Sequence, residues 1–272
     1  MLKRGIGETG LTDVTGCYPV CVIDAHADLT RDFAGLHAAG AVSLTLVTDV
    51  YFRPDPARLQ EMFDLVRPFK THYLHDYTRA RRIASHHRYE VKRAASACDI
   101  RVVPYEAHLD EWLTLYRYLV ARHGITGIQN LSDHYFHALA KLKNVLAIGA
   151  FSDDALISMH LWVEHENVLY SHLAASNDEG YRMRAAYAIH DYVLREYGEE
   201  RHIDLGGGAG LADDPDDGLA RFKKGFSNDA APCFLCGKIF DAERYERLSE
   251  MAAPHGIAGY FPRYRSPSTD AC

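Results

Sequence analysis

A carboxylate and a run of glycines stand close together in the second half of the chain. Asp204 ends a short apolar stretch, and after Leu205 come Gly206, Gly207 and Gly208. Three glycines let a backbone pass close to a ligand or to another strand. A carboxylate beside them could orient a substrate amine or accept its proton. The alternative is a tight turn in which Asp204 is a capping residue.

A second distinctive stretch, residues 78–93, is strongly basic. Six cations and Glu90 give it a formal charge of +5, and His86 and His87 lie among them. Clustered arginines and lysines are typical of contacts to phosphate groups. A solvated helix face is the simpler explanation of a charge run. The six cations are Arg79, Arg81, Arg82, Arg88, Lys92 and Arg93.

Two cysteine pairs could form a metal site. Three residues separate Cys17 from Cys21, and two separate Cys233 from Cys236. Four thiolates are a suitable ligand set for tetrahedral zinc. Both pairs have apolar and β-branched neighbours, however, and cysteine in such surroundings usually packs as a small hydrophobic residue. We therefore expect reduced thiols in the core and no metal site.

The composition is that of an ordinary globular protein, with 47% hydrophobic and 25% charged residues in a chain of 272. This length fits one large domain or two closely packed ones. The net charge of −7 argues against a surface coated with positive charge, but not against a local basic patch. No apolar run is long enough for a membrane span, and the first residues lack the apolar core of a secretory signal. We expect a cytoplasmic protein without membrane insertion.

The first half of the chain predicts a mixture of helices and strands. Asp55 and Pro56 supply an N-cap followed by proline at the first helical position. Gly124 should end a helix whose apolar residues repeat every 3.6 positions. Strands are expected at 41–50 and 100–105, and helices at 56–66, 80–97 and 109–122.

The second half predicts an antiparallel meander, then a helix and returning strands. A tight turn at 164–167 joins the last two strands of the meander. The block at 218–226 is interpreted as an extended segment, and Asp241 should cap a final helix. Strands are expected at 145–151, 155–163, 167–175, 202–205 and 233–240, and a helix at 185–193.

Three blocks in this half share their order and spacing with one family. They are VLYSHLAAS at 168–176, HIDLGG at 202–207 and GLARFKKGF at 218–226, with YFPRYR at 260–265 as a similar ending. Together they resemble the Fem-type aminoacyltransferases, a branch of the GNAT superfamily of N-acyltransferases. The resemblance implies an α/β (α+β) GNAT-like fold, with tandem GNAT-related units and helices flanking a central, largely antiparallel sheet.

The resemblance also implies a domain organisation. Residues 1–98 would form a partial GNAT-like unit and 99–240 the acyltransferase unit, with 241–272 returning to the first. The coiled-coil arm of peptidoglycan bridge enzymes is missing, because no heptad run appears. Their lipid-linked acceptor is therefore not implied.

Fem-type enzymes transfer an acyl group to an amine through a negatively charged tetrahedral intermediate. The lysine after the phenylalanine of the last block is implicated in stabilising that charge, and here these residues are Phe222 and Lys223. Lys224 is adjacent, but neighbours on an extended segment point to opposite faces, so we assign the role to Lys223. Solvated lysines at a strand edge are the alternative. His172, placed on the central strand of the meander, is a candidate base or acceptor contact, or else a core histidine.

The donor is inferred from a missing loop. GNAT enzymes that use coenzyme A bind its pyrophosphate with a Q/R-x-x-G-x-G/A loop at a helix start. The corresponding segment here, SNDEGYRMRAAY, has one glycine and two acidic residues. Fem-type enzymes also lack the loop and use aminoacyl-tRNA, whose phosphates the basic stretch would contact. Phe222, Gly206, Gly207, Tyr181 and Arg184 are assigned to substrate binding.

We therefore expect an aminoacyltransferase without a resident cofactor, which passes an aminoacyl group from aminoacyl-tRNA to a small-molecule or peptide amine. Two alternatives stay open. One is an N-acyltransferase that uses acyl-coenzyme A, and the other is a non-catalytic binding module with a GNAT fold. The sequence does not identify the amino acid, the acceptor or the oligomeric state.

Overall fold

The computed structural model describes residues 1–17, 19–127, 130–210, 213–214, 216–252 and 259–267. The chain divides into two compact units. Unit 1 consists of Met1–Lys70 with Pro232–Cys272, and unit 2 of Thr71–Ala231. The domain limits expected from the sequence are residues 98 and 240. They differ from the boundaries of the two compact units, and they stay a prediction.

Unit 1 contains four strands of a ten-stranded sheet, in the order β1-β2-β3-β10. Strands β1 and β2 are antiparallel, β2 and β3 parallel, and β3 and β10 antiparallel. Its elements are β1 (Leu2–Gly5), β2 (Thr12–Thr15), α1 (Thr30–Ala38), β3 (Ala41–Val47), α2 (Pro56–Met62), the first part of β4 (Leu65–His75), most of β10 (Asp229–Ile239), α9 (Ala242–Ala252) and a 3-10 turn at Arg263–Arg265.

One prediction for unit 1 is confirmed, and a second is confirmed in part. Asp55 caps α2 by accepting hydrogen bonds from the amides of Ala57 and Arg58, and Pro56 begins the helix. Core packing is confirmed for Cys21, Cys233 and Cys236, which are buried, but it is wrong for Cys17, which is exposed. Burial raises the pKa of Cys21 to about 11 and that of Cys236 to about 12. These thiols are therefore protonated and pack as apolar groups.

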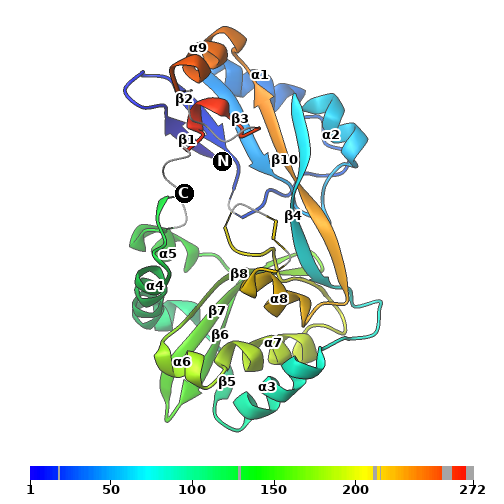
Figure 1. Cartoon of the computed structure of the whole chain (residues 1–272), viewed down its shortest axis with the longest axis vertical. Helices are drawn as coiled ribbons and strands as arrows, with labels where there is room; N and C mark the ends of the chain where they lie inside the picture. Colours follow the sequence, from blue (N-terminus) through cyan, green and yellow to red (C-terminus); the bar gives the residue numbers. More distant parts are fainter. Residues whose placement is uncertain (18, 128–129, 211–212, 215, 253–258, 268–272) are drawn as a thin grey trace. The chain divides into compact units, whose positions relative to one another are not determined.

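Unit 2 is built around strands in the order β4-β9-β8-β7-β6-β5 (Figure 1). Only β8 and β9 run parallel among these neighbours. Its other elements are α3 (Ser85–Ala95), β5 (Asp99–Val103), a 3-10 turn at Tyr105–His108, α4 (Leu109–His123), α5 (Asp133–Leu139), β6 (Val145–Ser152), β7 (Ala155–His165), β8 (Val168–Ser176), α6 (Asp178–Arg182), α7 (Ala185–Glu196), β9 (His202–Asp204) and α8 (Gly218–Lys224).

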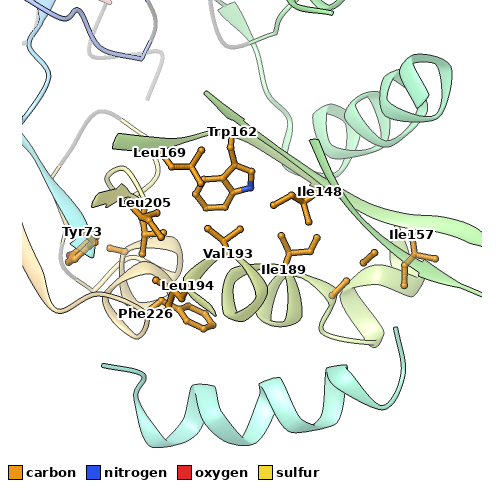
Figure 2. Close-up of a cluster of buried hydrophobic side chains, with 14 residues drawn as sticks. Tyr73, Ile148, Ile157, Trp162, Leu169, Ile189, Val193, Leu194, Leu205 and Phe226 are labelled. Atoms are coloured by element: carbon orange, nitrogen blue, oxygen red, sulfur yellow. The ribbon is translucent and has the colours of Figure 1, made fainter. Parts of the chain in front are cut away.

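Helices cover both faces of the sheet in unit 2. Helices α7 and α3 lie on one side of β6, β7 and β8, and α4 and α5 lie on the other (Figure 1). Figure 2 shows the core beneath α7, where Ile189 and Val193 pack against Trp162 of β7. All three side chains are fully buried. The fold expected from the sequence, mixed α/β with helices flanking a largely antiparallel sheet, is confirmed.

Several element predictions are also confirmed within unit 2. The meander is formed by β6, β7 and β8, and Glu166 in the turn between the last two strands has a positive φ of 51°. Gly124 ends α4 in the left-handed conformation. In unit 1, the amide of Arg244 donates to Asp241 at the start of α9, so that aspartate is the expected cap.

The interpretation of 218–226 as an extended segment is wrong. Residues Gly218–Lys224 form α8, because Asp217 caps the helix by accepting from the amide of Ala220. Val66, expected on a helix, lies in β4, since α2 ends at Met62. The strands β1, β2 and β4 and the helices α1, α5 and α6 were not predicted, and α6 lies where a loop was expected after the meander. No described helix is both long and apolar enough to cross a membrane.

Candidate active site

Asp204 lies where β9 ends and the glycine loop begins. It is paired with Tyr170 of β8 on one side and Leu74 of β4 on the other. The residue is 2% exposed, and its Oδ1 accepts a hydrogen bond from the amide of Gly206 at 2.7 Å. Gly206 has a φ of +77°, a conformation that glycine adopts without strain. The carboxylate therefore fixes the first turn of the loop.

The same carboxylate holds a histidine that the sequence analysis missed. Nδ1 of His72 lies 2.8 Å from Oδ2 and 3.0 Å from Oδ1 of Asp204. His72 is 7% exposed and belongs to β4. Phe69, Thr71 and Tyr73 are residue types common in strands and stand at alternate positions, and this was the available signal. Pro68 obscured it, because proline argues against a strand interior.

One aspartate ties the glycine loop to the beginning of α8. Oδ2 of Asp217 accepts from the amides of Ala209 and Ala220, both at 2.9 Å. A side chain on Gly208 would place its Cβ 2.9 Å from the same oxygen. The loop and the helix therefore pack too closely for any residue larger than glycine at this position.

Lys223 ties the loop to the other end of α8. Its Nζ donates to the carbonyl oxygen of Gly207 at 2.7 Å, and a Cβ on Gly206 would lie 2.9 Å from Nζ. Lys223 is partly buried, whereas Lys224 is exposed. Lys223 is thus the lysine that faces the loop. It does so from the last turn of a helix and not by alternation along a strand.

Phe222 packs its ring beneath the loop among aromatic side chains of α7. Its centroid lies 4.9 Å from that of Tyr187 and 4.8 Å from that of His190. Its backbone oxygen is 2.9 Å from Nε2 of His87 on α3. Burial lowers the pKa of His190 to about 4, so this imidazole is neutral at pH 7. Phe222 therefore anchors the helix that carries Lys223.

His172 lies on the third strand of the meander, β8, and not on the central one as expected. The pairing with β7 shifts here, since Leu161 faces Leu173 while Trp162 faces Ser171, which makes His172 the extra residue of a bulge. Its Nε2 is 2.6 Å from the hydroxyl oxygen of Tyr135 on α5. Burial lowers its pKa to about 4, so the ring is neutral at pH 7. Within the described residues, His172 makes no hydrogen bond to the glycine loop.

The two parallel strands separate just beyond the site. The ladder between β8 and β9 runs from Val168 to Tyr170 on one strand and from His202 to Asp204 on the other. There β9 ends, whereas β8 continues to Ser176. The glycine loop leaves β9 at this fork. Asp204 and Lys223 are therefore positioned beside the point where the described sheet opens.

The segment after β8 is closed by its own hydrogen bonds. Asn177 caps α6 by accepting from the amide of Gly180, and a Cβ on Gly180 would lie 2.3 Å from the carbonyl oxygen of Ile157. This glycine is therefore required by packing against β7. The amides that donate within the segment are those of Gly180, Tyr181, Met183, Arg184 and Tyr187.

Tyr181 and Arg184 make contacts that do not involve the glycine loop. The guanidinium of Arg122 lies 4.4 Å from the ring centroid of Tyr181. Arg184 is exposed, with a positive φ of 61°, and its Nε is 3.4 Å from a carboxylate oxygen of Glu90. The structure thus places the predicted substrate-binding residue Tyr181 in α6 and Arg184 at the N-cap of α7. Neither is hydrogen-bonded to Gly206 or Gly207 among the described residues.

The six predicted phosphate contacts are all exposed. Three of them precede α3 and three lie on it. Arg79 pairs with Asp76 and Asp229, and Arg93 pairs with Glu90. The buried side of α3 is formed by His87, Glu90 and Ala94, so its cations line the outer side of the helix. The remaining four cations are Arg81, Arg82, Arg88 and Lys92.

This fold and sequence match a known family. Residues 77–224 match the model of the acetyltransferase (GNAT) domain, which is more than half of the chain. The chain therefore belongs to the GNAT acetyltransferase-domain family. The match begins after His72 and ends at Lys224. No curated protein matches the sequence.

Three of the solved structures that resemble this chain share its fold at low sequence identity. FemX is similar with a TM-score of 0.64 at 13% identity, over 90% of this chain and 85% of that one. The C-terminal domain of a putative lysylphosphatidylglycerol synthetase from Agrobacterium fabrum has a TM-score of 0.60 at 13% identity, covering 78% and 72%. L-PGS from Bacillus licheniformis has a TM-score of 0.56 at 12% identity, covering 77% and 72%. At these identities the likeness shows the fold, which agrees with the Fem-type resemblance of the sequence.

Proposed function

We propose that the protein is an N-acyltransferase that moves an aminoacyl group from aminoacyl-tRNA to the amine of a small molecule or peptide. The observation that carries this proposal is the closed segment between β8 and α7. Five of its amides donate to acceptors within the segment, and Asp178 and Glu179 stand in its first turn. A diphosphate needs free amides and no neighbouring carboxylates. The segment therefore disfavours coenzyme A as the donor.

The outer side of α3 and the loop before it favour a polyanionic donor. Four exposed cations form no ion pair with a carboxylate in the part of the chain that the structure describes: Arg81, Arg82, Arg88 and Lys92. Cations in such an arrangement contact a nucleic-acid backbone without reading its sequence. Use of aminoacyl-tRNA would place the protein in the cytoplasm and would require no resident cofactor.

The chemical step needs no covalent enzyme intermediate. The acceptor amine attacks the ester carbonyl carbon, and a C–N bond forms as the carbonyl oxygen becomes negative. Collapse of this intermediate breaks the ester C–O bond and releases the tRNA hydroxyl, while one proton passes from the amine to that oxygen. The Lys223 ammonium group would stabilise the oxyanion, which is the largest contribution expected from the protein. Asp204 and His172 are the groups that the sequence suggests as acceptors of the proton from the attacking amine.

The test is a transfer assay. The protein is incubated with a pool of radiolabelled aminoacyl-tRNAs, and deacylation is recorded with and without candidate amines. Amine-dependent loss of one aminoacyl-tRNA supports the proposal. The matched control is Lys223→Ala, which should remove transfer without removing tRNA binding.

The family match favours a second candidate, an N-acyltransferase that uses acyl-coenzyme A. Calorimetry with coenzyme A separates the two donors, because binding below the millimolar range would contradict the tRNA assignment. Binding of RNA with no turnover of any aminoacyl-tRNA or acyl-coenzyme A would indicate a non-catalytic module instead.

A further inference from the structure

The pair formed by His72 and Asp204 fixes the protonation of the imidazole. An ionised carboxylate accepts hydrogen bonds and has no proton to give. Both Asp204 oxygens lie within 3.0 Å of Nδ1 of His72. In the neutral ring, Nδ1 therefore carries the proton and Nε2 has a free lone pair. A carboxylate that holds an imidazole in one tautomer prepares its other nitrogen to accept a proton.

Nε2 of His72 is available for that task. It makes no hydrogen bond within the part of the chain that the structure describes. Although it has no partner there, this nitrogen is not sealed from solvent. By contrast, Nε2 of the next histidine on β4, His75, is 2.7 Å from the carbonyl oxygen of Gly198.

His72 and Lys223 are anchored to the same loop. Asp204 bonds His72 and also the amide of Gly206, and the next residue, Gly207, bonds Nζ of Lys223. The sheet geometry shows which face of the sheet the pair occupies. Tyr73 and Leu205, one residue away, point into the cluster beneath α7 (Figure 2). Because side chains alternate along a strand, His72 and Asp204 point to the opposite face.

The two groups suggested by the sequence are less suited to take the proton. Both oxygens of Asp204 already accept hydrogen bonds, and the residue is 2% exposed. Nε2 of His172 is engaged by the Tyr135 hydroxyl. Burial also lowers the pKa of His172 to about 4, which makes it a weak base at pH 7.

We propose that His72 accepts the proton of the attacking amine at Nε2 and that Asp204 is the positioning residue that holds it. This inference rests on the proposed transfer to an amine. As the C–N bond forms, the N–H proton moves to Nε2, and His72 becomes an imidazolium paired with Asp204. When the C–O bond of the donor breaks, the leaving oxygen takes that proton, and His72 returns to its neutral form.

Chemical rescue tests the role of His72. The His72→Ala variant should lose about 10²- to 10³-fold in kcat, as expected for removal of a general base. Added imidazole should restore part of the rate in a saturable manner, because it fills the space of the missing ring. The His172→Ala variant is the matched control and should gain nothing from imidazole. A wild-type rate in His72→Gln, or no rescue of His72→Ala, would overturn the assignment.

A second readout tests Asp204 as a positioning residue. Asp204→Asn should lower kcat while leaving KM within about threefold, because it disturbs the base and not the binding of substrate. Imidazole should not rescue this variant, since its own His72 still fills the space. A change confined to KM would contradict the positioning role.

The tautomer gives a test that needs no turnover. Long-range ¹H–¹⁵N spectra of the labelled protein, with His72→Gln used to assign the signal, should show that the neutral ring carries its proton on Nδ1 and none on Nε2. An Nε2–H tautomer would refute the inference whatever the donor is. The kinetic comparison can also be made with acetyl-coenzyme A. The donor assignment can therefore fail while the assignment of His72 stands.

Discussion

Two adjacent lysines have different environments at the end of α8. Lys223 is partly buried and donates to Gly207, whereas Lys224 is exposed. Both carry the same charge, so any long-range electrostatic effect of the two on a bound anion should be similar. A difference between their variants therefore reports the local position of the ammonium group.

Replacement of Lys223 by alanine should lower kcat by about 10²- to 10³-fold, as does loss of one oxyanion donor in other enzymes. Lys224→Ala should change kcat by less than about threefold. Steady-state kinetics of both variants, with circular dichroism to confirm folding, is the measurement. Equal losses in the two variants would show that charge and not position matters.

His190 should make the stability of the protein dependent on pH. Burial lowers its pKa from 6.5 to about 4, and Lys223 and His87 act in the same direction, against a hydrogen bond to Ala186 O. The unfolded chain therefore binds more protons than the folded one between these two values. The stabilisation is present in full above pH 6.5 and is lost as the pH falls toward about 4.

In His190→Phe this contribution should disappear. The wild type should lose roughly 3 kcal/mol more than the variant between pH 7 and pH 4, from the size of the pKa shift. Urea unfolding at several pH values in this window measures the difference. The exposed His137→Gln variant is the control and should follow the wild type. Parallel pH profiles for His190→Phe and wild type would refute the prediction.

At the scale of elements, α8 depends on a close contact with α3. A Cβ on Gly225 would lie 2.2 Å from the ring of His87. The φ of Gly225 is −69°, which alanine adopts freely, so the obstacle is steric. The His87 ring also approaches the Phe222 carbonyl, one residue before Lys223. The position of the lysine therefore depends on this packing.

Gly225→Ala should destabilise the protein by about 1–3 kcal/mol, the usual cost of overpacking. It should also lower kcat, because α8 must shift. Gly218→Ala is the matched control, since nothing lies within 4 Å of its added Cβ. In the double variant His87→Ala/Gly225→Ala part of the stability should return. Thermal or urea unfolding tests this, and additive losses in the double variant would contradict the steric explanation.

The elements with strong local signals were predictable. The meander, α4 with its terminal Gly124, and the Asp55 cap of α2 follow from periodicity and capping alone. The error at α8 has a physical cause. Seven residues are too few to show a helical period clearly, and the decisive signal was the Asp217 cap in an acidic loop. β4 was missed because Pro68 interrupts it.

The candidate site was predictable where residues are adjacent in sequence. Asp204 stands beside the glycines, and Lys223 lies in a recognisable block, so both could be named. His72 could not, because its partner is 132 positions away and only the pairing of β4 with β9 joins them. Tyr135 is hidden for the same reason, since it meets His172 through the packing of α5 on the sheet.

At the scale of the whole molecule, the proposed donor should respond to charge on one surface. Reversal of three exposed cations, in the triple variant Arg81→Glu, Arg82→Glu and Arg88→Glu, removes candidate phosphate contacts. We expect the dissociation constant for aminoacyl-tRNA to rise at least about tenfold at low salt. The logarithm of the association constant falls linearly with the logarithm of the salt concentration. The magnitude of this slope should decrease by about 1 for each lost contact. Filter binding over a range of salt concentrations measures both.

An equal change of charge elsewhere provides the control. Arg31, Arg67 and Arg247 are exposed residues of unit 1, and their conversion to glutamate changes the net charge by the same amount. This variant should bind aminoacyl-tRNA nearly as the wild type does. If both triple variants lose affinity alike, the effect belongs to net charge, and the surface of α3 is not the binding site.

The discontinuity of unit 1 has a consequence for synthesis on the ribosome. Unit 2 is one continuous segment, whereas unit 1 needs residues from both ends of the chain, including β10 and α9. All residues of unit 2 are therefore synthesised before unit 1 is complete. Domains generally fold as units during synthesis. The amino-terminal strands must therefore wait for the last residues of the chain, and the nascent protein should carry its His72–Asp204 pair before its first strands have all their partners.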